Sequence, residues 1–214
     1  MASGKWLAAS GLSIGYRKPI AQNLSFELQS GLTCLIGPNG SGKSTLLKTI
    51  AGLIKPLSGT LPAFDAKTIA FVPANFPAET NIRVFDFIAL GRSPHTNAFG
   101  KLEQKDIDKI NSAMEQTETA HFAKFRVSSL SDGEKQRVAL ARALAQDTKI
   151  LLMDEPTAFL DYSHRIRLFE FLKKKAKEEN IAVLLSTHEL NFAEQYADRI
   201  LEFKSGLISY SIPS

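Results

Sequence analysis

A glycine-rich segment, GPNGSGKST over residues 37–45, carries the residue types that hold phosphate groups. It fits the pattern G-x-x-x-x-G-K-[ST], and its neighbours predict a buried strand over residues 32–36 and a helix after the loop. We expect Gly37, Gly40 and Gly42 to adopt positive φ angles and to turn backbone N–H groups inward around oxygen anions. The helix adds the positive end of its dipole. The segment therefore predicts a phosphate-binding loop, with a glycine-rich turn that binds nothing as the alternative.

Two side chains of this loop suit a bound nucleotide. Lys43 would reach the β- and γ-phosphates, and the Ser44 hydroxyl would ligate Mg²⁺. The nucleotide-contacting residues expected in the loop are Asn39, Gly40, Ser41, Gly42, Lys43, Ser44 and Thr45. Phosphate binding by itself does not distinguish ATP from GTP.

A second chemical feature is the segment KILLMDE over residues 149–155, a short apolar run that ends in two carboxylates. It is typical of a strand buried on both faces, which would deliver Asp154 and Glu155 to the carboxyl edge of a parallel sheet. There Asp154 would hold Mg²⁺, directly or through water. Glu155 would be the base that polarises a water for in-line attack on the γ-phosphate. Two acids in a solvated loop are the alternative.

A third feature is LSDGE over residues 130–134, which opens a helical segment. Ser131 and Glu134 have the spacing of a capping box, so Ser131 should be the N-cap and Glu134 should reach back to it. Without further context, a well-capped helix with no other role is the better explanation of this segment.

A fourth feature is AVLLSTH over residues 182–188, in which a buried strand leads into a polar turn with a histidine. A lone histidine after a strand, such as His188, is usually a structural hydrogen-bonding group.

The order of these four segments resembles that of ATP-binding cassette (ABC) ATPases, over nearly the whole chain. Residues 37–45 match the Walker A motif, residues 130–134 the family signature usually written LSGGQ, and residues 150–155 the Walker B motif. Residues 158–161 look like the D-loop, and His188 looks like the switch histidine. Tyr16 stands where the family has an aromatic residue that stacks on adenine, an interaction of about 1–2 kcal/mol.

This resemblance implies a mechanism with ATP and Mg²⁺ as cofactors. Lys43, Glu155 and His188 would be the catalytic residues. Two cassettes would pair head to tail, and Ser131 and the Gly133 N–H of one copy would contact the γ-phosphate held by the other, as at any helix N-terminus. ATP binding would close the pair and hydrolysis would release it.

Two departures from the family pattern stand out. Ala74, followed by Asn75, occupies the position of a glutamine whose carbonyl usually helps to ligate Mg²⁺. Either Asn75 substitutes, or coupling relies on other contacts. The signature also has Asp132 and Glu134 where glycine and glutamine are usual, and carboxylates near a γ-phosphate repel it. If Glu134 folds back in the capping box, part of that charge is directed at the helix end.

Composition limits the class of protein. At 214 residues with 44% apolar content, the chain can bury one substantial core. No apolar run approaches the roughly 18–20 residues needed to span a bilayer, and KWLAAS near the N-terminus is too short for a signal peptide. The single Cys34 is expected to pack inside a strand. A net charge of +4 does not suggest a nucleic-acid partner.

The predicted fold class is α/β, a P-loop NTPase (RecA-like) core with an N-terminal antiparallel β region and an inserted helical lobe, as the resemblance implies. We expect one domain over residues 1–214, with the core at about 1–78 and 146–214 and the lobe at about 79–145. In the lobe, Ile107, Ile110 and Met114 form an apolar stripe, and Gly91 and Pro94 break an earlier helix. The turn Lys204-Ser205-Gly206 should join two late strands.

The transported cargo is predicted from a weaker resemblance. ALGRSPH over residues 89–95 and PTAFLD over residues 156–161 are similar to segments of importers of iron-siderophore, haem and cobalamin. For Arg92 and His95, a polar loop after a helix is the alternative. The favoured hypothesis is the energising ATPase of such an importer, peripheral on the cytoplasmic face of the cell (inner) membrane. Its expected partners are integral permease subunits, a second cassette and an external binding protein. An exporter ATPase and a non-transport ABC protein remain as alternatives.

Overall fold

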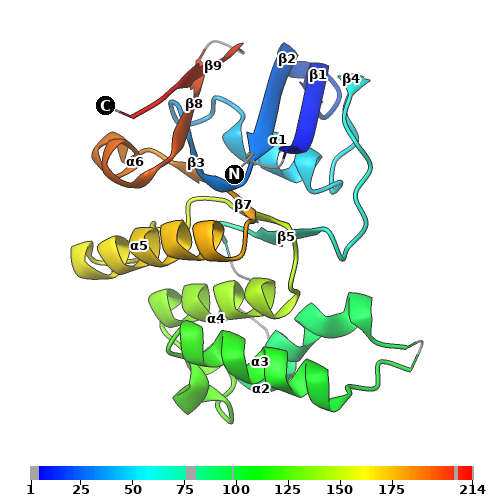
Figure 1. The fold of residues 1–214 in the computed structure, drawn as a ribbon, viewed down its shortest axis with the longest axis vertical. Helices are drawn as coiled ribbons and strands as arrows, with labels where there is room; N and C mark the ends of the chain where they lie inside the picture. The colour runs from blue at the N-terminus through cyan, green and yellow to red at the C-terminus, as the bar shows by residue number, and fades with distance from the viewer. Residues whose placement is uncertain (1–4, 76–80, 98, 205–206, 214) are drawn as a thin grey trace. The chain divides into compact units, whose positions relative to one another are not determined.

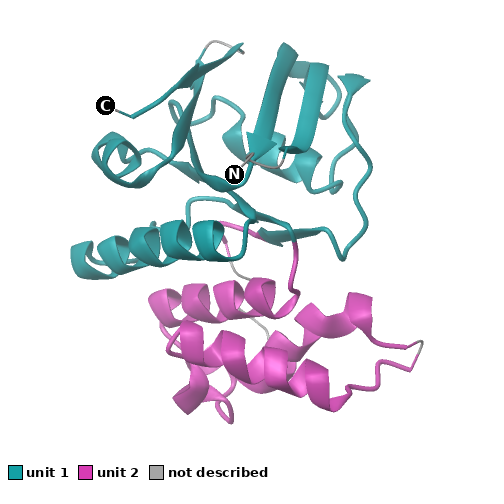
Figure 2. Ribbon diagram, viewed as in Figure 1, with its two compact units in different colours: residues 1–71, 149–214 teal, residues 72–148 magenta. Residues whose placement is uncertain are grey.

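The computed structural model describes residues 5–75, 81–97, 99–204 and 207–213. The chain forms two compact units, one from residues 1–71 and 149–214 and the other from residues 72–148 (Figure 2). Each unit has its own buried apolar cluster. Two segments far apart in sequence therefore build the first unit, whereas one continuous segment builds the second.

A six-stranded sheet forms the centre of the first unit (Figure 1). β3 pairs parallel with β7 and β8, and β6 pairs parallel with β7, while β9 pairs antiparallel with β8. Every residue of β6 and β7 is buried, as their apolar runs predict. The predicted turn residues Ser205 and Gly206 lie outside the described residues. In sheet order the strands are β5 (Ile69–Val72), β6 (Ile150–Met153), β7 (Ala182–Thr187), β3 (Gly31–Ile36), β8 (Arg199–Lys204) and β9 (Leu207–Ser211).

A smaller antiparallel sheet confirms the β region expected at the N-terminus. Its order is β2 (Pro19–Gln29), β1 (Lys5–Gly15) and β4 (Ser58–Thr60). Helix α1 (Lys43–Ile50) shares one buried apolar cluster with both sheets, to which it contributes Leu46 and Leu47. The phosphate loop therefore runs from the end of a central strand into a helix held by the core.

Two helices of the first unit, α5 (Tyr162–Glu178) and α6 (Leu190–Tyr196), pack against β3. Their contact is aromatic: the Phe169 ring stacks on Phe192 and Tyr196, with ring centroids 5.2 and 5.6 Å apart. Such pairs stabilise beyond their buried area by about 1 kcal/mol each. This packing fixes the start of α6, which directly follows the turn that carries His188.

Helices are the main elements among the described residues of the second unit. It contains α2 (Val84–Ala89), the 3₁₀ segment η1 (Leu90–His95), α3 (Gln104–Gln116), the 3₁₀ turns η2 (Ala120–Phe122) and η3 (Val127–Ser129), and α4 (Asp132–Ala145). The stripe predicted on α3 is confirmed, because Ile110 and Met114 are buried and Ile107 is half-buried. α2 ends before Gly91, and the chain tightens into a 3₁₀ helix that contains Pro94.

The polar-loop reading of Arg92 and His95 is wrong. Arg92 is buried in the 3₁₀ segment, where its Nε donates to Asp106 Oδ1 at 3.0 Å and its Nη1 donates to Ala145 O at 2.7 Å. His95 Nε2 lies 2.9 Å from Gln146 O. Both side chains therefore contact carbonyl groups at the C-terminal end of α4, where the Arg92 cation interacts favourably with the helix dipole.

Cys34 is fully buried in β3, and burial raises the pKa of its thiol to about 12. The thiol therefore remains protonated at neutral pH and packs as an apolar group. Among the helices of the described residues, none combines the length and apolar character needed to cross a lipid bilayer.

The buried Arg92–Asp106 pair predicts a stability effect. Arg92→Ala would leave the Asp106 carboxylate buried without its cation, and we expect a loss of about 3 kcal/mol in the free energy of unfolding. Urea unfolding followed by circular dichroism measures this. The control, Lys105→Ala, removes only an exposed ion pair to Glu103 and should leave unfolding unchanged. Equal stability of the two variants would contradict the prediction.

Candidate nucleotide and hydrolysis site

The phosphate loop needs its glycines for two different reasons. Gly40 and Gly42 adopt φ angles of +75° and +110°, as predicted. Gly37 does not lie in the left-handed region, so the prediction for it is wrong. A Cβ at Gly37 would instead lie 2.3 Å from Phe203 O, a distance that no side chain tolerates. Close approach to β8 therefore excludes side chains at the start of the loop, and backbone conformation disfavours them at its end.

Lys43, the first residue of α1, directs its ammonium group back over the loop. Its Nζ donates to Gly37 O at 2.8 Å and to Pro38 O at 3.2 Å, and lies 3.7 Å from Glu155 Oε1. The side chain is only 7% exposed. Burial strengthens the attraction of this cation for a phosphate oxygen, whereas the nearby Glu155 carboxylate opposes it.

A hydroxyl and a carboxylate meet at the base of the loop. Ser44 Oγ donates to Asp154 Oδ1 at 3.0 Å, and Ser186 Oγ donates to the same oxygen at 2.8 Å. Asp154 is 3% exposed. Hydroxyl and carboxylate oxygens are the donors that Mg²⁺ prefers, so Ser44 and Asp154 fit the ion that the sequence implies.

Glu155 adopts a strained backbone conformation at the end of β6. Its φ is +46°, which is rare for a residue with a side chain and typical of functional sites. Its N–H donates to Ser186 Oγ at 2.9 Å, and its Oε2 lies 3.0 Å from His188 Nδ1. The His188 side chain is 58% exposed and that of Glu155 19%. One carboxylate therefore contacts both Lys43 and His188.

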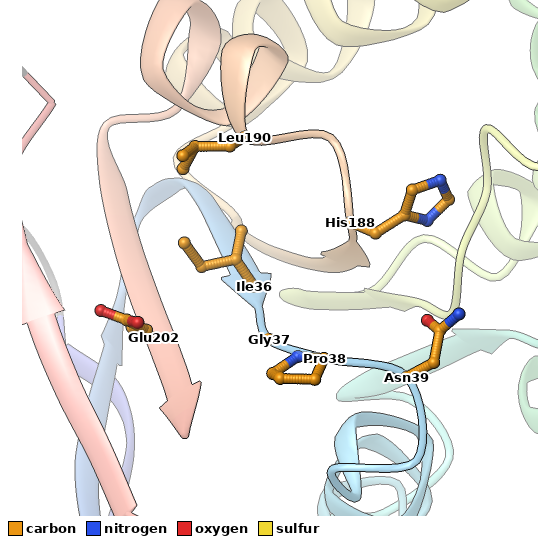
Figure 3. Close-up of a pocket in the computed structure, with 7 residues that line it drawn as sticks. All are labelled: Ile36, Gly37, Pro38, Asn39, His188, Leu190 and Glu202. Carbon is orange, nitrogen blue, oxygen red and sulfur yellow. The ribbon is translucent and has the colours of Figure 1, made fainter. Parts of the chain in front are cut away.

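The loop contains a buried hydroxyl that is available to a ligand. Ser41 Oγ has no hydrogen-bond partner among the described residues. A cavity of about 410 Å³ borders the loop. Figure 3 shows Pro38 and Asn39 on one side of it and the His188 turn on another. Its lining residues are Ile36, Gly37, Pro38, Asn39, His188, Leu190 and Glu202.

The remaining predicted nucleotide contacts in this unit lie in and beside the loop. Asn39 and Gly40 are exposed, and Thr45 is buried in the first turn of α1. Tyr16 is 64% exposed in the turn between β1 and β2. That turn leads directly to Ile20, whose Cγ2 would lie 2.9 Å from a Cβ placed on Gly42. The hairpin therefore brings Tyr16 to the neighbourhood of the loop with a ring free to stack.

The signature residues lie at the start of α4 in the second unit, and the capping box is present as predicted. Ser131 is the N-cap, and Glu134 Oε2 accepts from Ser131 N at 2.7 Å and from Ser131 Oγ at 2.8 Å. Hydrogen bonds from the Ser131 backbone and side chain hold the pKa of Glu134 below its usual range. The Glu134 charge is therefore directed at the helix end at neutral pH.

Ser186 is a site residue to which the sequence analysis assigned no role, although it lies in the singled-out strand segment. The available signal is its position: Ser186 is a polar residue near the carboxyl end of an otherwise apolar strand, where nucleotide sites form.

Ala74 lacks a side-chain oxygen and cannot supply the metal ligand that a glutamine provides there.

Comparison with known proteins agrees with this geometry. A family profile described as "ABC transporter" matches residues 21–158, more than half of the chain. The iron(3+)-hydroxamate import ATP-binding protein FhuC of Bacillus subtilis (strain 168) is 35% identical over 215 residues, covering 94% of this chain and 80% of the relative.

Two solved structures share the fold. One is described as an inward-facing conformation of a putative metal-chelate type ABC transporter, with TM-score 0.88 and 31% identity, over 98% of this chain and 83% of that one. The other, the dimeric structure of MJ0796, a bacterial ABC transporter cassette, has TM-score 0.87 and 25% identity, over 97% and 99% of the two chains.

The capping box predicts the effect of restoring the usual signature residue. Glu134→Gln keeps an oxygen that can accept from Ser131 N, so ATP turnover should change by less than about tenfold. The comparison variant Ser131→Ala removes the hydroxyl and should lower turnover further. Steady-state phosphate release at saturating ATP measures both. If Glu134→Gln dropped to background activity, Glu134 would have a direct catalytic role instead.

Proposed function

This chain belongs to the ABC transporter family as one of its ATP-hydrolysing subunits, and from that premise we propose that it powers import of a metal chelate. The candidate cargoes are an iron-siderophore, haem or cobalamin. The observation that carries the proposal is similarity over nearly the whole chain to an iron-hydroxamate import subunit, together with a metal-chelate type structural neighbour. The ALGRSPH segment at residues 89–95 adds to this support.

Hydrolysis is assigned to the groups that meet at the carboxyl edge of the large sheet. Lys43 binds β- and γ-phosphate oxygens from its place over the loop. Glu155 accepts a proton from the attacking water, and His188 orients the Glu155 carboxylate through their 3.0 Å contact. Ser44 and Asp154 hold Mg²⁺, which when bound neutralises phosphate charge. Tyr16 stacks on the adenine ring.

The two compact units act as one cassette over residues 1–214, and two cassettes complete each site. Ser131 and the Gly133 N–H, at the N-terminus of α4, bind the γ-phosphate held by the partner copy. The dimeric cassette structure among the similar folds supports this pairing. Because each site then needs both copies, ATP closes the pair and hydrolysis opens it.

The cassette acts on integral permease subunits at the cytoplasmic face of the cell membrane, and an external binding protein delivers the cargo. The relative's role in import supports this arrangement. An exporter ATPase is the alternative within the same family. A non-transport ABC protein is disfavoured by the mild net charge of +4.

Pairing predicts a concentration dependence of hydrolysis. ATPase activity per molecule should rise with protein concentration, because the signature of one copy completes the site of another. Phosphate release over a dilution series measures this dependence. Fast turnover independent of concentration would contradict shared sites.

Glu155→Gln should abolish ATP turnover while retaining ATP binding, because the amide cannot take the proton. Phosphate release measures the turnover, and equilibrium dialysis measures the ATP binding.

The proposed role in transport predicts that this chain binds a membrane protein. Affinity purification of this chain from native membranes solubilised in mild detergent should recover a polytopic permease. Recovery of an external binding protein with it would mark import and provide a protein on which to test chelates. The Lys43→Ala variant, which lacks the phosphate-binding ammonium group, tests whether recovery of the permease depends on nucleotide. Recovery with ribosomes or soluble proteins alone would overturn the transport proposal.

A further inference from the structure

A carboxylate next to His188 reaches the loop that follows Glu155. Glu189 Oε1 accepts from Thr157 Oγ1 at 3.1 Å and pairs with Arg165 Nη1 at the same distance. The Glu189 side chain is 13% exposed and Thr157 is fully buried. A hydrogen bond between a carboxylate and a buried hydroxyl, reinforced by a guanidinium, has a defined geometry and resists exchange with water.

Arg165 fastens this carboxylate to the same loop from α5. Its Nε donates to Leu160 O at 2.7 Å, while its Nη1 contacts Glu189. The loop is itself compact, because Ala158 N donates to Glu155 O at 3.2 Å and Leu160 N donates to Thr157 O at 3.1 Å. Arg165, in α5, and Glu189, the residue before α6, therefore hold a short, internally bonded segment from two sides of the sequence.

Together with the Glu155–His188 contact, the Thr157–Glu189 hydrogen bond links two chain segments at two points. Glu155 is two residues before Thr157, and His188 is bonded directly to Glu189. The Thr157–Glu189 hydrogen bond and the Glu155–His188 contact at 3.0 Å join the two chain segments. Neither segment can move away from the other without breaking one of the two contacts. On the strand side, the bond from Glu155 N to Ser186 Oγ prevents the same separation.

We propose that Glu189, Arg165 and Thr157 are positioning residues that hold His188 against Glu155 for ATP hydrolysis, an inference that rests on the function proposed above. None of the three touches the reacting atoms. Their effect is to restrict where the His188 turn lies relative to the loop after Glu155. Orientation of this kind lowers the cost of reaching a reactive geometry.

The first test observes His188 directly in the nucleotide-free protein. The chain has four histidines, so selective isotope labelling gives four ring signals, and His188→Ala assigns the relevant one. Glu189→Ala and Thr157→Val should each shift the His188 ring signals. His95 and His121, in the other compact unit, should keep theirs. The matched control Glu194→Gln changes an exposed acid on α6 and should shift none of the four histidine signals.

The second test measures rate and affinity. Glu189→Ala should lower the hydrolysis rate at saturating ATP by about tenfold. The dissociation constant for ATP should stay within about twofold, because the phosphate loop is untouched. Glu189→Gln, which can still accept from Thr157, should recover part of the rate. In a His188→Ala background, Glu189→Ala should add no further loss, since both act through one contact.

Three outcomes would overturn the proposal: unmoved His188 signals in Glu189→Ala, moved signals with an unchanged rate, and additive losses in the double variant. A rate loss that follows reduced thermal stability while the His188 signals stay in place is a purely structural effect and overturns it too. If the wild-type chain hydrolysed no ATP at any concentration, the proposed function would fail. The histidine signals would then still decide whether Glu189 holds His188.

Discussion

The parallel pairing of β3, β6 and β7 is the constraint on which the site depends. Parallel strands end at the same edge, so the phosphate loop, the Asp154–Glu155 pair and the His188 turn emerge side by side from separate parts of the sequence. Full burial of β6 and β7 fixes their register, since a slip would carry polar ends into the core. The catalytic geometry is therefore a consequence of how the core packs.

At that edge, hydrogen bonds with Ser186 hold Asp154 and Glu155 in place. Ser186 Oγ donates to Asp154 Oδ1 and accepts from Glu155 N, so one hydroxyl sets both carboxylate-bearing residues. Glu155 is held at φ +46°, a conformation that persists only where surrounding contacts enforce it. The hydrogen bond from Glu155 N to Ser186 Oγ is one such contact, and the proposed role of Glu189 adds a second through Thr157.

The signature helix α4 has side-chain hydrogen bonds at both of its ends. Glu134 satisfies its N-terminus through Ser131, while Arg92 binds Ala145 O and His95 binds Gln146 O at its C-terminus. The N-terminal end is the one proposed for phosphate recognition, whereas the C-terminal end is held by the buried Arg92. The residues of the ALGRSPH segment thus have a structural role in the lobe, beside any relation to cargo.

The phosphate loop, the buried strands, the capping box and the order of motifs could all be predicted from the amino-acid sequence, because each depends on local spacing and periodicity. It did not reveal that Gly37 is required by Phe203 O, that Arg92 is buried against Asp106, or that Ser186 and Glu189 support Glu155. These contacts join residues that are distant along the chain, as Gly37 and Phe203 are. Such residues come into contact only when the sheet and helices have folded, so local sequence patterns do not reveal these contacts.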